Sequence, residues 1–166
     1  MVVSRSAYNP AMPDPTIVAA SDLLDRSLNS MREVIARADP EALDWRPGPD
    51  TNSIAVLAVH SMHSTRMWLS VATGAPLPER DRPSEFLATV DGVDELLGFF
   101  DTMAADCRAL LDTPDPFDPG AVHVTGRDDE ETATGAHALM HALEHLREHV
   151  AHAQLTDQLW EMDHPR

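Results

Sequence analysis

Basic residues are scarce in this chain, and their scarcity excludes two classes of partner. Twelve arginines, with no lysine, stand against 28 aspartates and glutamates, so the formal net charge is −16 over 166 residues. A surface with that charge repels both phosphate backbones and anionic lipid headgroups. We therefore expect neither nucleic acid nor a membrane among the partners, and look instead for a small-molecule substrate.

Cysteine and long apolar runs are also nearly absent. The single cysteine, Cys107, excludes an intramolecular disulfide, and it falls on the apolar spacing of a predicted helix. A small buried hydrophobe is therefore a better interpretation of Cys107 than a nucleophile. No apolar run is long enough to span a bilayer, and residues 1–15 lack the apolar segment of a signal peptide. We therefore expect a cytoplasmic protein.

The sequence does contain four segments in which apolar side chains recur at helical spacing. They predict helices over about residues 16–39, 53–72, 93–112 and 134–160. Asn52 or Ser53 can cap the second helix, and proline-rich stretches separate the segments. The short run AVHVT at 121–125 has strand character, but we find no second β segment with which it could pair.

These patterns predict an all-α fold, a four-helix bundle in which the two longer connections are crossovers or lids. Residues 1–15 carry three prolines and little pattern, so we interpret them as an extended arm. Residues 16–166 then form one helical bundle domain, with a homodimer as one option for its assembly.

The last predicted helix carries five histidines, in the stretch HALMHALEHLREHVAH from His137 to His152. Each residue rotates a helix by about 100°, so a metal can bridge histidines four residues apart but not His137 and His149, which lie roughly 120° apart. His145, His149 and His152 flank the apolar stripe of this helix. His141, and especially His137, turn toward solvent.

The second predicted helix places one histidine, His60, in the middle of its apolar face, whereas His63 lies nearer the edge. A buried neutral imidazole must form a hydrogen bond or bind a metal. Together with an HxxxH pair of the last helix, His60 would supply three nitrogen ligands and leave one coordination position open. Such a site resembles a catalytic metal site more than a structural one.

Two other interpretations remain open at this level. A histidine-rich helix can be a solvated face, and a core histidine is often a hydrogen-bonded packing residue. The residues His141, Glu144 and His145 also fit the inverted zincin signature HxxEH. That signature is short, and it would leave the buried His60 without a role.

Two stretches of the chain resemble a known family. LDWRPGPDTNSIAVLAVHSMHSTRMWL is similar to the first half of the DinB-like (DinB/YfiT-type) metalloenzyme superfamily, in which W-R-P-x-P and a capping Ser precede a helix with a ligand histidine and a later aromatic, here Trp68. HALEHLREHVAHAQL resembles the C-terminal helix of that family, in which a further histidine precedes an HxxxH pair. The resemblance extends from about residue 16 to residue 160.

The resemblance implies a bundle of the DinB/YfiT type, with His60 as the first metal ligand and His145 and His149 as the HxxxH pair. It implies that His141 does not bind the metal. One departure is that His152 stands where the family commonly has the glutamine of H-x-G-Q. His152 is then a base beside the metal, a fourth ligand or an idle neighbour, and we favour the base.

The family includes thiol-dependent S-transferases and isomerases that use mycothiol, bacillithiol or glutathione. The resemblance therefore implies an enzyme in which a divalent metal (Zn, Ni or Fe, with Cu also compatible with histidine ligands) activates a small thiol toward an electrophile. Two alternatives are a metal-dependent hydrolase and a non-catalytic stress protein that binds a metal or another ligand.

Overall fold

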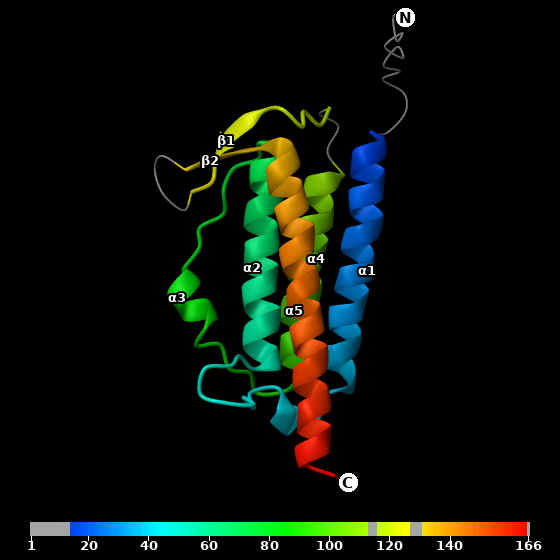
Figure 1. Ribbon diagram of the computed structural model, residues 1–166, viewed down its shortest axis with the longest axis vertical. Helices are drawn as coiled ribbons and strands as arrows, with labels where there is room; N and C mark the ends of the chain where they lie inside the picture. The colour runs from blue at the N-terminus through cyan, green and yellow to red at the C-terminus, as the bar shows by residue number, and fades with distance from the viewer. Residues whose placement is uncertain (1–13, 113–115, 127–130, 166) are drawn as a thin grey trace, which may run out of the picture.

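The computed structural model describes residues 14–112, 116–126 and 131–165. Its four long helices run side by side along one axis (Figure 1). They are α1 (Pro15–Arg37), α2 (Ile54–Thr73), α4 (Val93–Leu111) and α5 (Gly135–Asp163). The predicted all-α, four-helix fold is confirmed. The predicted arm lies outside the described residues, except that Asp14 caps α1 and Pro15 begins it.

Polar side chains set where the long helices begin. The Ser53 hydroxyl accepts a hydrogen bond from the Val56 amide, 3.2 Å away, at the start of α2. Thr134 caps α5 in the same way. The α2 helix ends at Gly74, whose φ of +70° is a left-handed conformation that favours glycine, and a Cβ there would lie 2.9 Å from the His123 ring. Local capping chemistry therefore places the helix ends close to their predicted positions.

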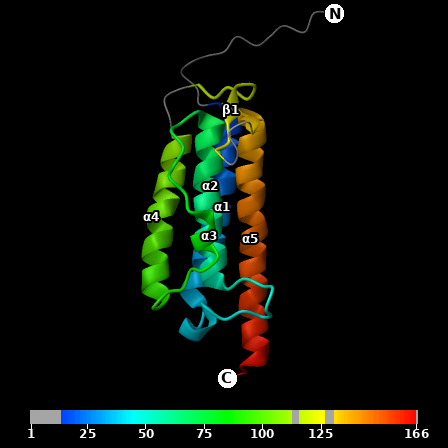
Figure 2. The same ribbon diagram turned by 90° about the vertical axis from the view of Figure 1, so that its left-hand side faces the viewer.

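The helices occupy the corners of a square, with α1 opposite α2 and α4 opposite α5 (Figures 1 and 2). Each of α2 and α1 packs against both α5 and α4, and the most extensive pairing joins α2 to α5. Fully buried side chains fill the interior, among them Leu24, Met31, Ile35, Met62, Leu69, Leu96, Phe100, Leu139 and Leu146. Within the described residues, none of the helices is both long and apolar enough to cross a bilayer.

The connection after α2 has to travel the length of the bundle, because α2 and α4 point the same way (Figure 1). This return segment, residues 74–92, carries the short helix α3 (Arg82–Glu85), which lies outside the four helical segments predicted from the sequence. The prediction of a long crossover is confirmed. The segment also brings polar residues alongside the middle of α2, where the histidine of that helix lies.

The expectation that no sheet would form was wrong. Strand β1 (Val122–Val124) pairs antiparallel with β2 (Thr132–Thr134), and Val122 lies opposite Thr134. The partner strand is only three residues long and runs directly into α5, so its pattern is too short to be recognised as a strand. A further short helix, η1 (Pro40–Ala42), follows α1. Neither feature changes the architecture of the bundle.

Candidate metal centre

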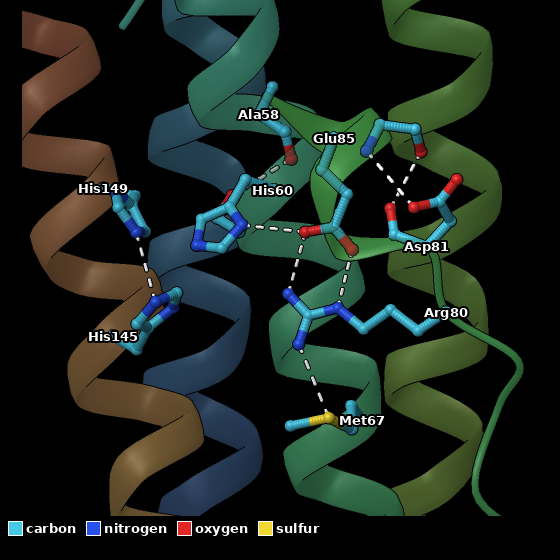
Figure 3. Close-up of polar contacts among 10 residues, drawn as sticks. Ala58, His60, Met67, Arg80, Asp81, Glu85, His145 and His149 are labelled. Carbon is cyan, nitrogen blue, oxygen red and sulfur yellow. Dashed lines mark hydrogen bonds and ion pairs between the residues drawn. The ribbon is translucent and has the colours of Figure 1, made fainter. Parts of the chain in front are cut away.

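Three histidines from two helices converge in the middle of the bundle (Figure 3). His60 comes from α2, and His145 and His149 come from consecutive turns of α5. Each can offer one ring nitrogen such that the three atoms lie within 4.8 Å of one another. The Nε2 atoms of His145 and His149 are 3.2 Å apart. The structure therefore brings together the three histidines that the resemblance implied as ligands.

The neighbouring histidines on α2 differ in burial, as the helical spacing predicted. His60 is only 5% exposed and its ring centroid lies about 5 Å from those of His145 (5.2 Å) and His149 (5.1 Å). His63 is half-buried at the edge of the same face, where its ring lies 5.6 Å from that of Phe99. Only His60 points into the space between α2 and α5.

A buried carboxylate holds the other side of the His60 ring. Nδ1 of His60 lies 2.8 Å from Oε2 of Glu85, the last residue of α3. Arg80 in turn donates to both carboxylate oxygens of Glu85, at 2.6 and 2.8 Å. Figure 3 shows the three side chains in a row, with Glu85 between the imidazole and the guanidinium. Sequence reasoning missed this pair, because its position depends on the path of the return segment.

The protonation of Glu85 determines the tautomer of His60. Burial raises the pKa of Glu85, but its hydrogen bonds to Arg80 and His60 outweigh burial and leave that pKa below its usual range. The ionised carboxylate can only accept, so Nδ1 of His60 carries the proton. Nε2 then presents its lone pair, and the carboxylate fixes the orientation of the ring.

All three histidines of the cluster are held in the neutral form. Burial lowers the pKa of His145 to about 3, and repulsion from His149 and His60 adds to the effect. Burial and the same kind of repulsion lower the pKa of His149 to about 4. Burial also lowers the pKa of His60, although Glu85 opposes it. Neutral imidazole is the form that binds a metal, so no proton has to leave the ligands at neutral pH.

The arrangement fits a divalent transition metal. Two nitrogens bound to one tetrahedral metal at 2.0–2.1 Å lie about 3.3 Å apart, close to the 3.2 Å between the Nε2 atoms of His145 and His149. The Nδ1 atoms of these two residues are buried and have no hydrogen-bond partner in the described part of the chain. Two neutral imidazoles pressed together without such partners cost stability, and a shared metal would offset that cost.

The remaining histidines of α5 lie outside this cluster. His152 is exposed, and its ring centroid is 5.7 Å from that of His149. His141 is partly buried rather than solvent-facing, because its ring packs 4.4 Å from that of Trp68. The group of three does not include His141, so the HxxEH pairing with His145 does not form the site. The role of His152 as a base stays a prediction.

Comparison with known proteins defines the class of this protein. Residues 23–153 match the DinB superfamily, and the chain belongs to that family. It is similar in fold to a solved structure described as "Crystal structure of the conserved protein of locus from Enterococcus faecalis". That match has a TM-score of 0.69 and 19% identity, and it covers 90% of this chain and 98% of the other. A comparison with curated proteins finds no match.

Proposed function

We propose that this protein is a divalent-metal-dependent enzyme that transfers a low-molecular-weight thiol to a small electrophile. The observation that carries the proposal is the cluster of three neutral imidazoles from α2 and α5. Three histidine ligands leave coordination positions open for a substrate, which is typical of catalytic rather than structural sites. Membership of the DinB superfamily supports the same interpretation.

His60, His145 and His149 would hold the metal, which we propose is Zn, Ni or Fe. When bound, it would supply a positive charge that favours a thiolate over a thiol at neutral pH. Glu85 and Arg80 keep the His60 ring in one tautomer and one orientation. Phe86 packs against the same ring, with centroids 4.5 Å apart, and excludes water from that face.

We assign the proton transfer to His152. This residue is exposed, lies one turn beyond His149 on α5 and borders a pocket. In the proposed reaction, a ring nitrogen of His152 accepts the proton of the thiol. The sulfur then forms a bond to a carbon of the electrophile, and a leaving group departs with the electron pair of the broken bond. Mycothiol, bacillithiol and glutathione are the candidate co-substrates.

The test is thiol consumption by the metal-loaded protein in the presence of a panel of electrophiles such as 1-chloro-2,4-dinitrobenzene. The matched variants are His149→Ala, which removes a ligand, and His137→Ala, which removes an exposed histidine of the same helix. We expect His149→Ala to abolish turnover and His137→Ala to retain it. Equal rates in wild type and His149→Ala would refute thiol transfer.

Two further outcomes of the same experiment would favour other functions. Hydrolysis of ester or amide substrates without any thiol would favour a metal-dependent hydrolase. Stoichiometric metal without turnover of any substrate would favour a protein that only binds a metal or another ligand. His152→Gln should lower kcat but leave metal content unchanged, if His152 acts as the base.

A further inference from the structure

Histidines on three consecutive turns of α5 repeat the spacing of a chelating pair. His141, His145 and His149 stand four residues apart. The ring centroids are 5.6 Å apart in the outer pair, His141 and His145, and 4.4 Å apart in the inner pair, His145 and His149. Two histidines at this spacing share one side of a helix and can bind one metal ion together. His145 therefore belongs to two overlapping pairs, and His60 completes only the inner one.

The histidines of α5 become less accessible in steps toward the cluster. His137 is exposed, His141 is partly buried, and Nδ1 of His145 is fully buried. The His137 and His141 rings are parallel to within 3°, with centroids 6.2 Å apart. His141 thus lies between an exposed position of the helix and the histidine cluster, at the place where an ion from solvent would first meet a chelating pair that includes a ligand of the cluster.

The indole of Trp68 holds the His141 ring in place. Trp68 is only 4% exposed, and its ring centroid lies 4.4 Å from that of His141 in an edge-to-face arrangement. The exposed His137 lies farther from the same indole, at 6.2 Å. A ring that is already held by packing loses less conformational freedom when it binds a metal than a freely rotating one. His141 is therefore better prepared for ligation than His137.

The number of available ligands directs an ion from the outer pair to the cluster. The outer pair offers two imidazoles, whereas His60, His145 and His149 offer three. Because His145 is common to both sets, it can keep its bond to the ion while the other ligands exchange. The net charge of −16 attracts cations to the surface from which they enter.

We propose that His141 and His145 form an entry site, which takes a divalent metal ion from solvent and delivers it to the histidine cluster. His145 retains the ion while His149 and His60 replace His141. His141 is then a loading residue and not a ligand of the final site, in agreement with its place outside the group of three. The inference rests on the metal site of the proposed function but not on thiol transfer.

The test measures the rates of zinc loading and zinc release by stopped-flow fluorescence with a zinc indicator. His141→Phe keeps an aromatic ring against Trp68 and removes both ring nitrogens. We expect zinc to load about tenfold more slowly into the metal-free variant than into the wild type. Since an ion that leaves passes through the same entry site, release to excess EDTA should slow by the same factor. The equilibrium Kd for zinc should therefore stay unchanged.

Two further variants sharpen the test. His141→Leu should slow loading and release as His141→Phe does, because both lack the imidazole. His137→Gln removes an exposed histidine one turn away on the same helix, and this matched control should load and release zinc like the wild type. A residue that only supports the packing of the cluster would behave differently, since its loss would raise Kd and speed release.

The possible results separate this inference from the proposed function. Loading of His141→Phe at the wild-type rate, or faster release with a raised Kd, would overturn the entry site while the metal centre stands. Equal slowing in His137→Gln would overturn the assignment to His141. Slow loading in His152→Gln alone would place the entry on the other side of the cluster. Failure of the wild type to bind zinc would overturn the metal centre and the entry site together.

Discussion

The histidine cluster and the surroundings of Cys107 are two buried places in one bundle where burial has opposite chemical consequences. Burial, with a smaller contribution from Asp106, raises the pKa of the Cys107 thiol to about 12. Burial also lowers the pKa of His145 to about 3. Burial favours the neutral form of both the Cys107 thiol and the His145 imidazole, because a charged group loses favourable hydration away from water. The neutral thiol is a poor nucleophile, whereas the neutral imidazole is a good metal ligand.

The two places also differ in their partners. Cys107 is fully buried in the apolar core, which includes Phe100 and Leu111. The cluster instead has Glu85 beside it, a buried carboxylate that accepts hydrogen bonds both from Nδ1 of His60 and from the partly buried Arg80. The apolar surroundings of Cys107 leave its thiol neutral and unreactive. The Glu85 carboxylate, in contrast, orients the His60 ring so that its other nitrogen can bind a metal.

The largest expected effect concerns the inert region. At pH 8 the folded protein should react with iodoacetamide at Cys107 at least about a thousandfold more slowly than the urea-unfolded protein, because the thiolate is so rarely populated. The measurement is the time course of alkylation by mass spectrometry. Rapid labelling of the folded protein would show that Cys107 is accessible and reactive, which would contradict the contrast drawn between Cys107 and the histidine cluster.

The next effect concerns the carboxylate that orients His60. Glu85→Gln should weaken metal binding by about 10- to 100-fold, because the ring loses its ionised acceptor. Competition with a chelator of known affinity measures this change. Glu95→Gln, at the exposed start of α4, is the matched control and should bind metal like the wild type. An unchanged affinity in Glu85→Gln would leave the Glu85 carboxylate without a role at the site.

Acid should destabilise the metal-free protein through the cluster. The pKa values of His145 (about 3) and His149 (about 4) lie below the ordinary value of 6.5. As the pH falls from 6.5 toward 5, these two histidines therefore take up protons in the unfolded chain but stay neutral in the native state. The free energy of unfolding should therefore fall as the pH drops from 6.5 to 5, by roughly 3 kcal/mol for the two groups together.

The measurement is a series of urea denaturation curves in the presence of EDTA at pH 7, 6 and 5. The double variant His145→Leu/His149→Leu should lose most of this dependence, because the groups that take up protons on unfolding are gone. If the variant keeps the slope of the wild type, the acid sensitivity originates elsewhere in the fold.

The smallest effect is a gain of stability in the absence of metal. His149→Leu removes a buried Nδ1 that has no partner in the described part of the chain, and should stabilise the metal-free protein by about 1 kcal/mol. His137→Leu, at an exposed position of the same helix, should bring no such gain. Thermal unfolding in EDTA tests both variants. A clear loss of stability in His149→Leu would mean that the imidazole is well accommodated without a metal.

Much of the fold follows from local patterns in the sequence. Apolar periodicity and caps such as Ser53 predict the four long helices, because helix formation depends on neighbours three and four residues apart. The same periodicity places His60 on the inner face of α2 and the HxxxH pair beside the stripe of α5. The choice of His145 and His149 as that pair came from the family resemblance.

Other features depend on long-range placement and have no local signature. Glu85 reaches His60 only because the return segment runs alongside α2, and no spacing within that segment indicates this path. The β1/β2 hairpin rests on strands of three residues each, too short for a pattern to form. The packing of His141 against Trp68 depends likewise on the register between α5 and α2.

The central claim is that His60, His145 and His149 bind one metal together, and thermal unfolding with and without zinc tests it most directly. A metal that binds only the native state stabilises it by about 4 kcal/mol when its free concentration is a thousandfold above Kd. That should raise the melting temperature of the wild type by roughly ten degrees. His63→Ala, at the edge of the same face of α2, should keep this shift, whereas His60→Ala should lose most of it and still fold without metal. Equal zinc-dependent shifts in the wild type and His60→Ala would contradict the assignment.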